Sequence, residues 1–248
     1  MHPLCCSIMN TFQFQRLRLI KQLDFCYFVY PGASHNRFEH SIGVSHLAGK
    51  LARVLHRNQP DLNITYQDVL CVEIAGLCHD LGHGPFSHLF DGKFIPKIAP
   101  KKRWSHEVAS VQMFDHLIEK NKLRKEFTRY RLDDTDITFI KELIYPQGKY
   151  EGRPENKRFL YEIVANKRNG IDVDKWDYFA RDCRMLGISN GFDHNRFMKF
   201  VRVIEVDGEY QLCIRNKMAR DVSEMFHTRD IIFWRACQHK VKNIIASM

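Results

Sequence analysis

His79-Asp80-Leu81-Gly82 is the stretch of this 248-residue chain from which its fold and chemistry are best interpreted. On a helix, neighbouring side chains diverge by about 100°. His79 and Asp80 still converge on one metal ion if the helix passes close to it and their rotamers turn inward. An imidazole nitrogen together with a carboxylate oxygen suits Fe, Mn or Zn rather than Ca. Because an isolated His-Asp pair is more often structural, the surrounding residues decide between the two interpretations.

Two further residues complete a ligand set around this pair. His40 lies in Asn36-Arg37-Phe38-Glu39-His40-Ser41, and Asp174 lies in Gly170-Ile171-Asp172-Val173-Asp174-Lys175. The resulting H…HD…D set is similar to the pattern of the HD metallophosphohydrolases. We therefore predict one divalent transition metal, Zn, Fe or Mn, bound by His40, His79, Asp80 and Asp174.

The composition excludes several classes of protein. A length of 248 residues and 44% hydrophobic content predict one large core, and hence a single domain over residues 1–248. No run approaches the roughly 20 apolar residues of a membrane span, and the N-terminal sequence lacks the pattern of a secretory signal. Eight Cys without a regular framework favour reduced thiols in the cytosol or nucleus. The net charge of +9 favours polyanionic partners such as nucleotides, RNA or DNA, or else a solvated basic surface.

The spacing of apolar residues predicts a mainly α-helical fold. Helices are expected over residues 12–23, 41–57 and 68–81, from a cap at Ser105 to residue 116, and over 159–184 with a break near Gly170. The helix over 68–81 would deliver His79 and Asp80 at its C-terminal end. Residues 201–215 predict a small β-hairpin, because β-formers flank Asp207-Gly208. The polar segment 120–155 is expected to be a surface excursion, and the last residues are expected to be helical.

Three more histidines, His83, His88 and His106, surround the central stretch. Imidazole is charged or neutral near pH 7, so these residues suit general acid catalysis and phosphate contacts. The alternative is that they support the metal ligands from outside the coordination sphere. Asp91 follows His88 by three residues, which allows it to orient an imidazole and raise its pKa, or else to be a surface loop residue.

Fixed positive charge flanks two of the predicted ligands. Arg37 lies about one helical turn before the first ligand, and Lys175 directly follows Asp174. Tyr178 and Asp182 continue this second segment at helical spacing. One helix would thus present a metal ligand, a cation, a hydroxyl and a carboxylate, as phosphoryl transfer requires. The alternative is a solvated charged helix. The sequence has no Gly-rich phosphate loop, which excludes a P-loop mechanism.

Long runs of the chain closely resemble a known family. These runs are Thr11-Phe12-Gln13-Phe14-Gln15-Arg16-Leu17-Arg18 and residues 31–41, 75–91 and 166–182. They resemble the animal SAM-and-HD-domain deoxynucleoside triphosphate (dNTP) triphosphohydrolases, from about residue 10 to the C-terminus and most weakly over 120–150. The resemblance implies an α-helical HD fold that hydrolyses dNTPs to deoxynucleoside and triphosphate. It also implies Mg²⁺ travelling with the substrate, and a location in the nucleus, with the cytoplasm as the alternative.

The resemblance implies a role for each matching position. His40, His79, Asp80 and Asp174 would hold the metal, and His88 would be the general acid, supported by Asp91 and His106. The phosphate-contacting positions are Arg37, His83, His88, Lys175 and Tyr178. The deoxyribose positions are Gln22, Leu23 and Asp182, and further substrate-side positions are Gln238, His239 and Lys240.

The nucleotide-activator positions of the family match only in part. Gln15 and Arg18 fall on the positions of a guanine-nucleotide activator (GTP or dGTP), and Arg196, Phe200, Arg215 and Lys217 fall on those of a second nucleotide. The sequence departs from the family at Asn10, Asp221, Phe233, Trp234 and Cys237. It also begins after the SAM domain and ends before the C-terminal lobe of the family, so we expect weaker homo-oligomers than the family forms.

Three functions remain for comparison. The first is metal-dependent hydrolysis of dNTPs, which the complete metal set favours. The second is a catalytically weak module that binds nucleotides or single-stranded nucleic acid on an HD scaffold, which the altered pocket positions favour. The third is another HD phosphohydrolase such as a nucleotide phosphodiesterase, which is disfavoured because Gln22 and Asp182 match sugar contacts.

Overall fold

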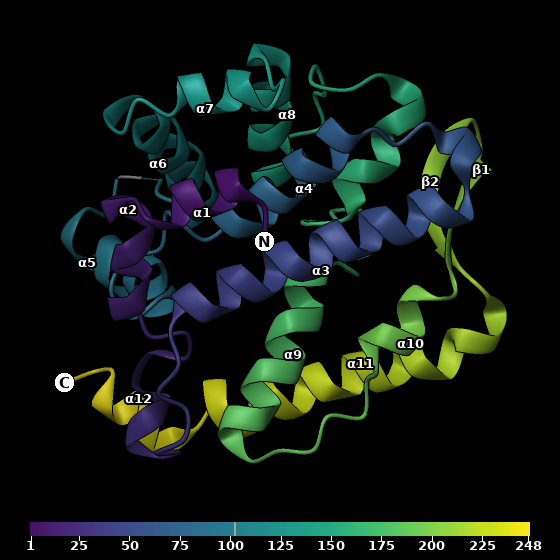
Figure 1. Ribbon diagram of the computed structural model, residues 1–248. Helices are drawn as coiled ribbons and strands as arrows, with labels where there is room; N and C mark the ends of the chain where they lie inside the picture. The colour runs from purple at the N-terminus through teal and green to yellow at the C-terminus, as the bar shows by residue number, and fades with distance from the viewer. Residues whose placement is uncertain (102) are drawn as a thin grey trace.

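The computed structural model describes residues 1–101 and 103–248, and it confirms a mainly α-helical fold with one small two-stranded sheet (Figure 1). In chain order, the α-helices are α1 (Pro3–Met9), α2 (Phe12–Gln15), α3 (Arg37–Asn58), α4 (Tyr66–Cys78), α5 (Ile95–Ile98), α6 (His106–Lys120), α7 (Arg124–Arg129), α8 (Asp134–Ile144), α9 (Val173–Leu186), α10 (His194–Met198), α11 (Ala219–Ile232) and α12 (Lys240–Ile245). The strands are β1 (Val201–Val206) and β2 (Glu209–Ile214).

Helices α3 and α4 form the centre of the fold, and α3 runs the length of the molecule in Figure 1. Each begins with a capping box, Asn36 with Glu39 for α3 and Thr65 with Asp68 for α4. These boxes satisfy backbone N–H groups that the first helical turn leaves without partners. The two helices approach closely where a Cβ on Gly76 would lie 3.1 Å from the backbone of α3. The capped first turns and the close packing of α3 against α4 together fix the position of the C-terminal end of α4. The histidine-rich stretch begins there.

Helix α9 crosses α3 on the other side (Figure 1). A Cβ at Gly43 would lie 1.8 Å from Asp177 Oδ1, so only glycine permits this approach. Trp176 and Phe179 of α9 are buried in the core, as the sequence predicts for the apolar side of this segment. The predicted break near Gly170 is confirmed, because Gly170 has φ +70° and α9 starts at Val173.

The hairpin is confirmed with the predicted turn. Strands β1 and β2 pair antiparallel from Val201↔Ile214 to Val206↔Glu209. Asp207 and Gly208 both have positive φ, at 52° and 82°. Such turns match the right-handed twist of the flanking strands.

Three predicted segments differ from the structure in instructive ways. Residues 12–23 are not one helix: α2 passes into a 3-10 turn (Arg16–Leu19), and then Ile20 is extended because its carbonyl accepts from Arg37 N at 2.9 Å. Helix α4 ends at Cys78, so His79 and Asp80 follow the helix rather than ending it. The prediction that 120–155 is a surface excursion is wrong, because α8 packs on α4.

The helix expected from residue 159 to the break is instead a 3-10 helix over Glu155–Glu162, whereas two other helix expectations are confirmed. Ser105 caps α6 by accepting from Val108 N, and the helix continues to Lys120. The chain ends in helix α12, as the apolar spacing indicates. All eight cysteines are free thiols. Among the described residues, the helices are all too short or too polar to cross a bilayer.

Candidate metal and phosphate site

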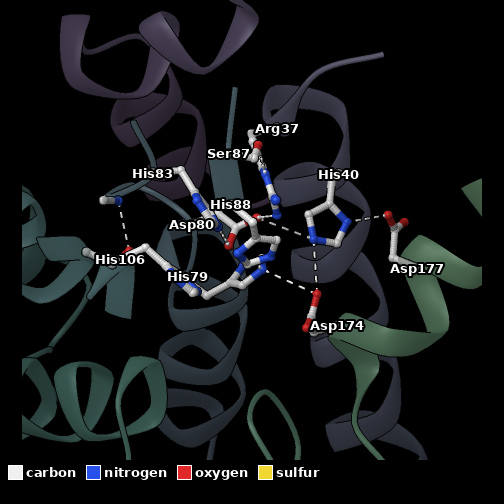
Figure 2. Close-up of polar contacts among 12 residues, drawn as sticks. Arg37, His40, His79, Asp80, His83, Ser87, His88, His106, Asp174 and Asp177 are labelled. Atoms are coloured by element: carbon white, nitrogen blue, oxygen red, sulfur yellow. Dashed lines mark hydrogen bonds and ion pairs between the residues drawn. The ribbon is translucent and has the colours of Figure 1, made fainter. Parts of the chain in front are cut away.

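Three parts of the chain bring the predicted metal ligands together (Figure 2). His40 comes from the first turns of α3, His79 and Asp80 follow α4, and Asp174 lies in the first turn of α9. Nε2 of His40 is 3.0 Å from Asp174 Oδ1 and 3.5 Å from Asp80 Oδ2. Nε2 of His79 is 3.5 Å from Asp174 Oδ1 and 3.4 Å from Asp80 Oδ1.

Both imidazoles are held so that Nε2 faces this point. Nδ1 of His40 is 2.8 Å from Asp177 Oδ2, and Nδ1 of His79 is 2.8 Å from the carbonyl oxygen of Gly76. A proton on Nδ1 satisfies both of these acceptors and leaves the Nε2 lone pair free. Fixing the tautomer through the second nitrogen is how proteins orient metal-binding histidines.

The geometry fits a divalent metal. Both Nε2 atoms are buried, and within the described residues neither has a hydrogen-bond partner. One ligand atom each from His40, His79 and Asp174 lies within 4.8 Å of the others. Burial lowers the pKa of His40, but the neighbouring carboxylates of Asp174 and Asp177 outweigh burial and raise its pKa to about 10. The carboxylates that attract a proton here attract a metal cation for the same reason, and an N/O donor set suits Fe, Mn or Zn.

Asp80 is shared between the metal point and a buried arginine. Its Oδ2 accepts from Arg37 Nη1 at 2.7 Å, while Arg37 Nε donates to Ser87 Oγ at 2.9 Å. Burial raises the pKa of Asp80, but Arg37 and two histidines lower it far more, so the carboxylate is ionised. Arg37 is therefore engaged within the protein, and Ser87 holds it there. Ser87 has φ +54°, and its hydroxyl also donates to the carbonyl oxygen of Lys21 at 2.6 Å.

The other three predicted histidines form a second cluster beside the first (Figure 2). The ring of His83 stacks on that of His106, with centroids 4.1 Å apart. Asp91 Oδ2 lies 3.0 Å from His106 Nδ1 and 3.5 Å from His88 Nδ1. Gly82 allows the loop to press on α6, since a Cβ there would lie 2.2 Å from Ser110 N. The side chain of His88 is 68% exposed.

A cavity of about 490 Å³ opens on the metal point, and its wall contains cations as well as carboxylates. The cations are Lys167, Arg168 and Lys175, and the carboxylates are Asp80, Glu107, Asp172 and Asp174. Nζ of Lys175 is 3.3 Å from both oxygens of Asp172, the residue that also caps α9. Burial raises the pKa of Asp172 to about 6. Lys167, Arg168 and Lys175 are the groups of this wall whose positive charge suits phosphate oxygens.

A second cavity, of about 530 Å³, is lined in part by His88. The predicted sugar contacts Gln22 and Leu23 line it, as do Phe233 and Cys237. Asp182 is instead buried beside His35, whose Nε2 is 2.6 Å from Asp182 Oδ1. Tyr178 is half-buried on α9, one turn beyond Lys175. The predicted substrate-side residues Gln238, His239 and Lys240 lie immediately after Cys237, at the start of α12.

The predicted activator residues fall in two places far apart in Figure 1. Gln15 and Arg18 lie together near α2, where Arg18 Nε donates to Gln15 Oε1 at 2.8 Å. The others lie around α10 and the end of the hairpin: Arg196 Nη1 is 2.9 Å from Asp221 Oδ1, and Lys217 Nζ is 4.0 Å from the ring of Phe200. Arg215 is exposed in the turn after β2. Within this chain, the two groups do not form one site.

A larger cavity, about 770 Å³, lies elsewhere, between the N-terminal residues, α3 and α4. None of the predicted site residues line it, so the size of a cavity does not by itself indicate where the functional site lies in this protein. The residues that sequence reasoning missed are His35, Ser87, Asp172 and Asp177. Each acts by orienting a predicted residue across a long sequence separation, for which the sequence offers no local pattern. Asp172 is the exception, because an Asp before an amphipathic run is a helix-cap signal.

Comparison with known proteins agrees with this geometry. The HD domain family matches residues 37–182. The chain is 58% identical to the human deoxynucleoside triphosphate triphosphohydrolase SAMHD1, over 100% of this chain and 41% of that protein. It is 59% identical to the zebrafish (Danio rerio) protein of the same name, over 100% of this chain and 42% of that protein. It is 45% identical to the SAMHD1 homolog of Dictyostelium discoideum, over 98% of this chain and 44% of that protein. The chain thus spans about two fifths of the length of these relatives.

Proposed function

The chain belongs to the HD-domain family, and on that premise we propose that it is an enzyme that hydrolyses deoxynucleoside triphosphates to deoxynucleoside and triphosphate. The observation that carries the proposal is the pair of imidazoles, His40 and His79, whose buried Nε2 atoms face Asp174 beside a cavity of about 490 Å³. The names of the relatives supply the substrate class, and the cavity supports it by its size and by the three cations in its wall.

His40, His79, Asp80 and Asp174 would hold one divalent transition metal, which when bound supplies Lewis acidity for hydrolysis. The two cavities divide the substrate between them. Lys175, with Lys167 and Arg168, would contact phosphate oxygens on one side. Gln22 and Leu23 would contact the deoxyribose on the other. Mg²⁺ would accompany the triphosphate and offset its charge.

His88 is the proposed general acid for the departing 5′-oxygen. Its Nδ1 lies 3.5 Å from Asp91, whose carboxylate is also 3.0 Å from His106. Burial raises the pKa of Asp91, but its two histidine partners lower it well below the usual range, so the carboxylate is negative at neutral pH. A carboxylate beside Nδ1 orients the ring, which leaves Nε2 as the nitrogen that would donate the proton.

The proposal is tested by incubating the purified chain with each dNTP, with and without GTP, and measuring released triphosphate. We expect release from dNTPs and much less from the matching ribonucleotides. When a histidine of the site is replaced in this assay, His116→Ala is the matched control, because His116 is an exposed histidine on the same helix as His106. Activity on ribonucleotides equal to that on dNTPs would contradict the proposed sugar contacts.

One observation favours the alternative, a catalytically weak nucleotide-binding module. Arg37 is tied to Asp80 and Ser87, and Lys175 to Asp172, so both cations must exchange partners before they bind phosphate. Binding of dGTP without release of triphosphate, under any of Mn²⁺, Fe²⁺ or Zn²⁺, would establish this alternative. Nuclear location and GTP activation are parts of the proposal that follow from the resemblance alone.

A further inference from the structure

The second cavity contains a buried ion pair next to the proposed sugar contacts. Asp24 directly follows Gln22 and Leu23 in the sequence, and it lines this cavity together with Lys242 of α12. Nζ of Lys242 is 2.8 Å from Asp24 Oδ2, and the two side chains are only 9% and 12% exposed. The segment that would contact the deoxyribose therefore places its next side chain where a group attached to that sugar would lie.

Stability alone is a poor explanation for this pair. Two charges taken out of water lose hydration, and apolar residues of similar volume often replace such a pair without loss of stability. The same cavity is also lined by Gln22, whose buried Oε1 has no hydrogen-bond partner among the described residues. Buried acceptors without partners are rare unless something else satisfies them. The cavity is thus built for a ligand that carries polar groups.

The hydrogen-bonding capacity that the ion pair leaves unused is specific. A lysine ammonium has three donors. Within the described part of the chain Lys242 uses two of them, on Asp24 Oδ2 and on the carbonyl oxygen of Cys237 at 3.2 Å. Each carboxylate oxygen of Asp24 accepts one contact, Oδ2 from Lys242 and Oδ1 from the backbone N–H of Phe25. Because a carboxylate oxygen accepts two hydrogen bonds, one donor and two acceptor positions remain for a ligand.

We propose that Asp24 and Lys242 recognise a guanine base, so that dGTP is the preferred substrate; this inference rests on the proposed function. The Watson–Crick edge of guanine has two neighbouring donors, N1–H and N2–H, which match the two oxygens of a carboxylate. Its acceptor O6 lies beside them and matches an ammonium. Adenine, cytosine and thymine each have a single donor group on that edge, so each leaves one oxygen of Asp24 without a donor.

The cavity also offers a surface for the face of the base. Phe233 lines it, and the 40% exposed side chain of Phe233 provides a ring on which a base can stack. Stacking holds every base in a similar way, so it contributes affinity and little selectivity. The volume of about 530 Å³ is within the usual range for pockets that bind small molecules. Selection among bases is therefore left to Asp24 and Lys242.

The first measurement changes the substrate and leaves the protein intact. We would determine kcat/KM for triphosphate release from the four dNTPs and from deoxyinosine triphosphate (dITP), in which the base lacks the 2-amino group of guanine. GTP is kept at one saturating concentration, so that any activator effect of GTP is the same in every assay. We expect dGTP to exceed dATP, dCTP, dTTP and dITP by at least ~10-fold, because a hydrogen bond to a charged group contributes about 1.5–3 kcal/mol. Equal kcat/KM for the four dNTPs, or for dGTP and dITP, would overturn the proposal.

The second measurement assigns the preference to the ion pair. Asp24→Asn turns one acceptor oxygen into a donor, so it should lower kcat/KM for dGTP by at least ~10-fold and change that for dATP little. Lys242→Met should raise KM for dGTP and leave kcat unchanged, because a contact with the base acts equally in the ground state and the transition state. Asp115→Asn, which alters an ion pair with Lys141 outside both cavities, should keep the preference. Equal losses toward every dNTP in Asp24→Asn would mean that the pair only holds the structure, and would overturn the proposal.

Failure of base recognition and failure of the proposed function give different results. Hydrolysis of all dNTPs with equal efficiency retains the hydrolase and loses the guanine contact. If no dNTP releases triphosphate, equilibrium dialysis with deoxyguanosine and deoxyadenosine decides, because binding of a nucleoside requires no hydrolysis. Deoxyguanosine bound at least ~10-fold more tightly, with the difference lost in Asp24→Asn, would support base recognition without the hydrolase. Equal binding of the two nucleosides, or binding of neither, would overturn it.

Discussion

Asp177 Oδ2 lies 2.8 Å from His40 Nδ1, and this contact fixes which nitrogen of His40 faces the metal point. The same carboxylate accepts two hydrogen bonds from Arg181, at 2.8 and 2.9 Å. Asp177 lies one turn after Asp174 on α9, so a single helix supplies a ligand and the residue that orients another ligand. The close crossing at Gly43 brings the two helices near enough for this contact.

We predict that Asp177→Asn weakens metal binding while the chain stays folded. Residues that orient metal ligands typically contribute about 10–100-fold to affinity, and an amide oxygen is a poorer acceptor for His40 than a carboxylate. Metal affinity can be measured by competition with a fluorescent chelator. Arg181→Met is the control, because it removes the other partner of Asp177 and leaves the contact with His40. Equal losses in the two variants would mean that Asp177 acts on stability alone.

The metal assignment itself is tested by His79→Ala combined with Asp80→Ala. The purified wild type should carry one tightly bound transition metal, and the double variant should lose it, since two of four ligands are gone. Elemental analysis gives the metal content, and circular dichroism checks the fold. Asp115→Ala with His116→Ala is the matched control, an adjacent Asp-His pair outside both clusters. Equal metal content in the wild type and the double variant would refute the assignment.

A buried ionic cluster at the start of α4 predicts a pH dependence of stability. Asp68 is 1% exposed and pairs with Arg153 at 2.6 Å and with Lys157 at 2.5 Å. Burial raises the pKa of Asp68, but Lys157, Arg153 and the backbone of Thr65 outweigh it and lower the pKa below its usual value. Its stabilisation is therefore complete above the unfolded pKa of about 4 and is lost as pH falls through the lower folded pKa.

Asp68→Asn should accordingly reduce the free energy of unfolding by about 3–5 kcal/mol at pH 7, because it leaves Lys157 without its carboxylate partner and Arg153 with Asp136 alone. The difference from the wild type should narrow as pH falls below about 4. Urea unfolding at pH 7 and at progressively lower pH measures it. Asp61→Asn, at an exposed position before α4, serves as the control. If the difference in free energy of unfolding between the wild type and Asp68→Asn stayed constant as pH fell, the loss of stability would come from packing and not from the charge of Asp68.

The elements that local sequence patterns specify were predictable. The hairpin turn Asp207-Gly208 and the cap at Ser105 depend on residues within a few positions of one another, and both are confirmed. The prediction for segment 120–155 is wrong because it rests on the average polarity of the segment, whereas one side of α8 is apolar and buried. Ile137, Ile140 and Ile144 follow helical spacing in α8, and all three are buried against the core. A search for helical spacing of apolar residues over 134–144 alone, instead of over the whole segment, predicts this buried side of the helix.

The residues that orient the site were not predictable in the same way. The partners of His40 and Asp182 are Asp177 and His35, each more than a hundred positions away in the sequence. Their pairing depends on how the helices cross, and the crossing depends on close approaches such as that at Gly43. The four predicted ligands come from a family pattern, which already encodes the tertiary arrangement, and the structure brings them together.

The chemistry is tested most directly by comparing His88 with Lys175. If His88 is the general acid, His88→Ala should lose most of its turnover, by about 10²–10⁴-fold, yet still bind nucleotide. Lys175→Ala should weaken binding as well, because a point charge on the triphosphate acts in the ground state and in the transition state. Single-turnover kinetics and equilibrium binding of dGTP separate the two effects. Lys199→Ala, outside both cavities near α10, controls for the loss of a lysine. Full hydrolysis by His88→Ala would place the acid elsewhere, with His106 the next candidate because it shares Asp91.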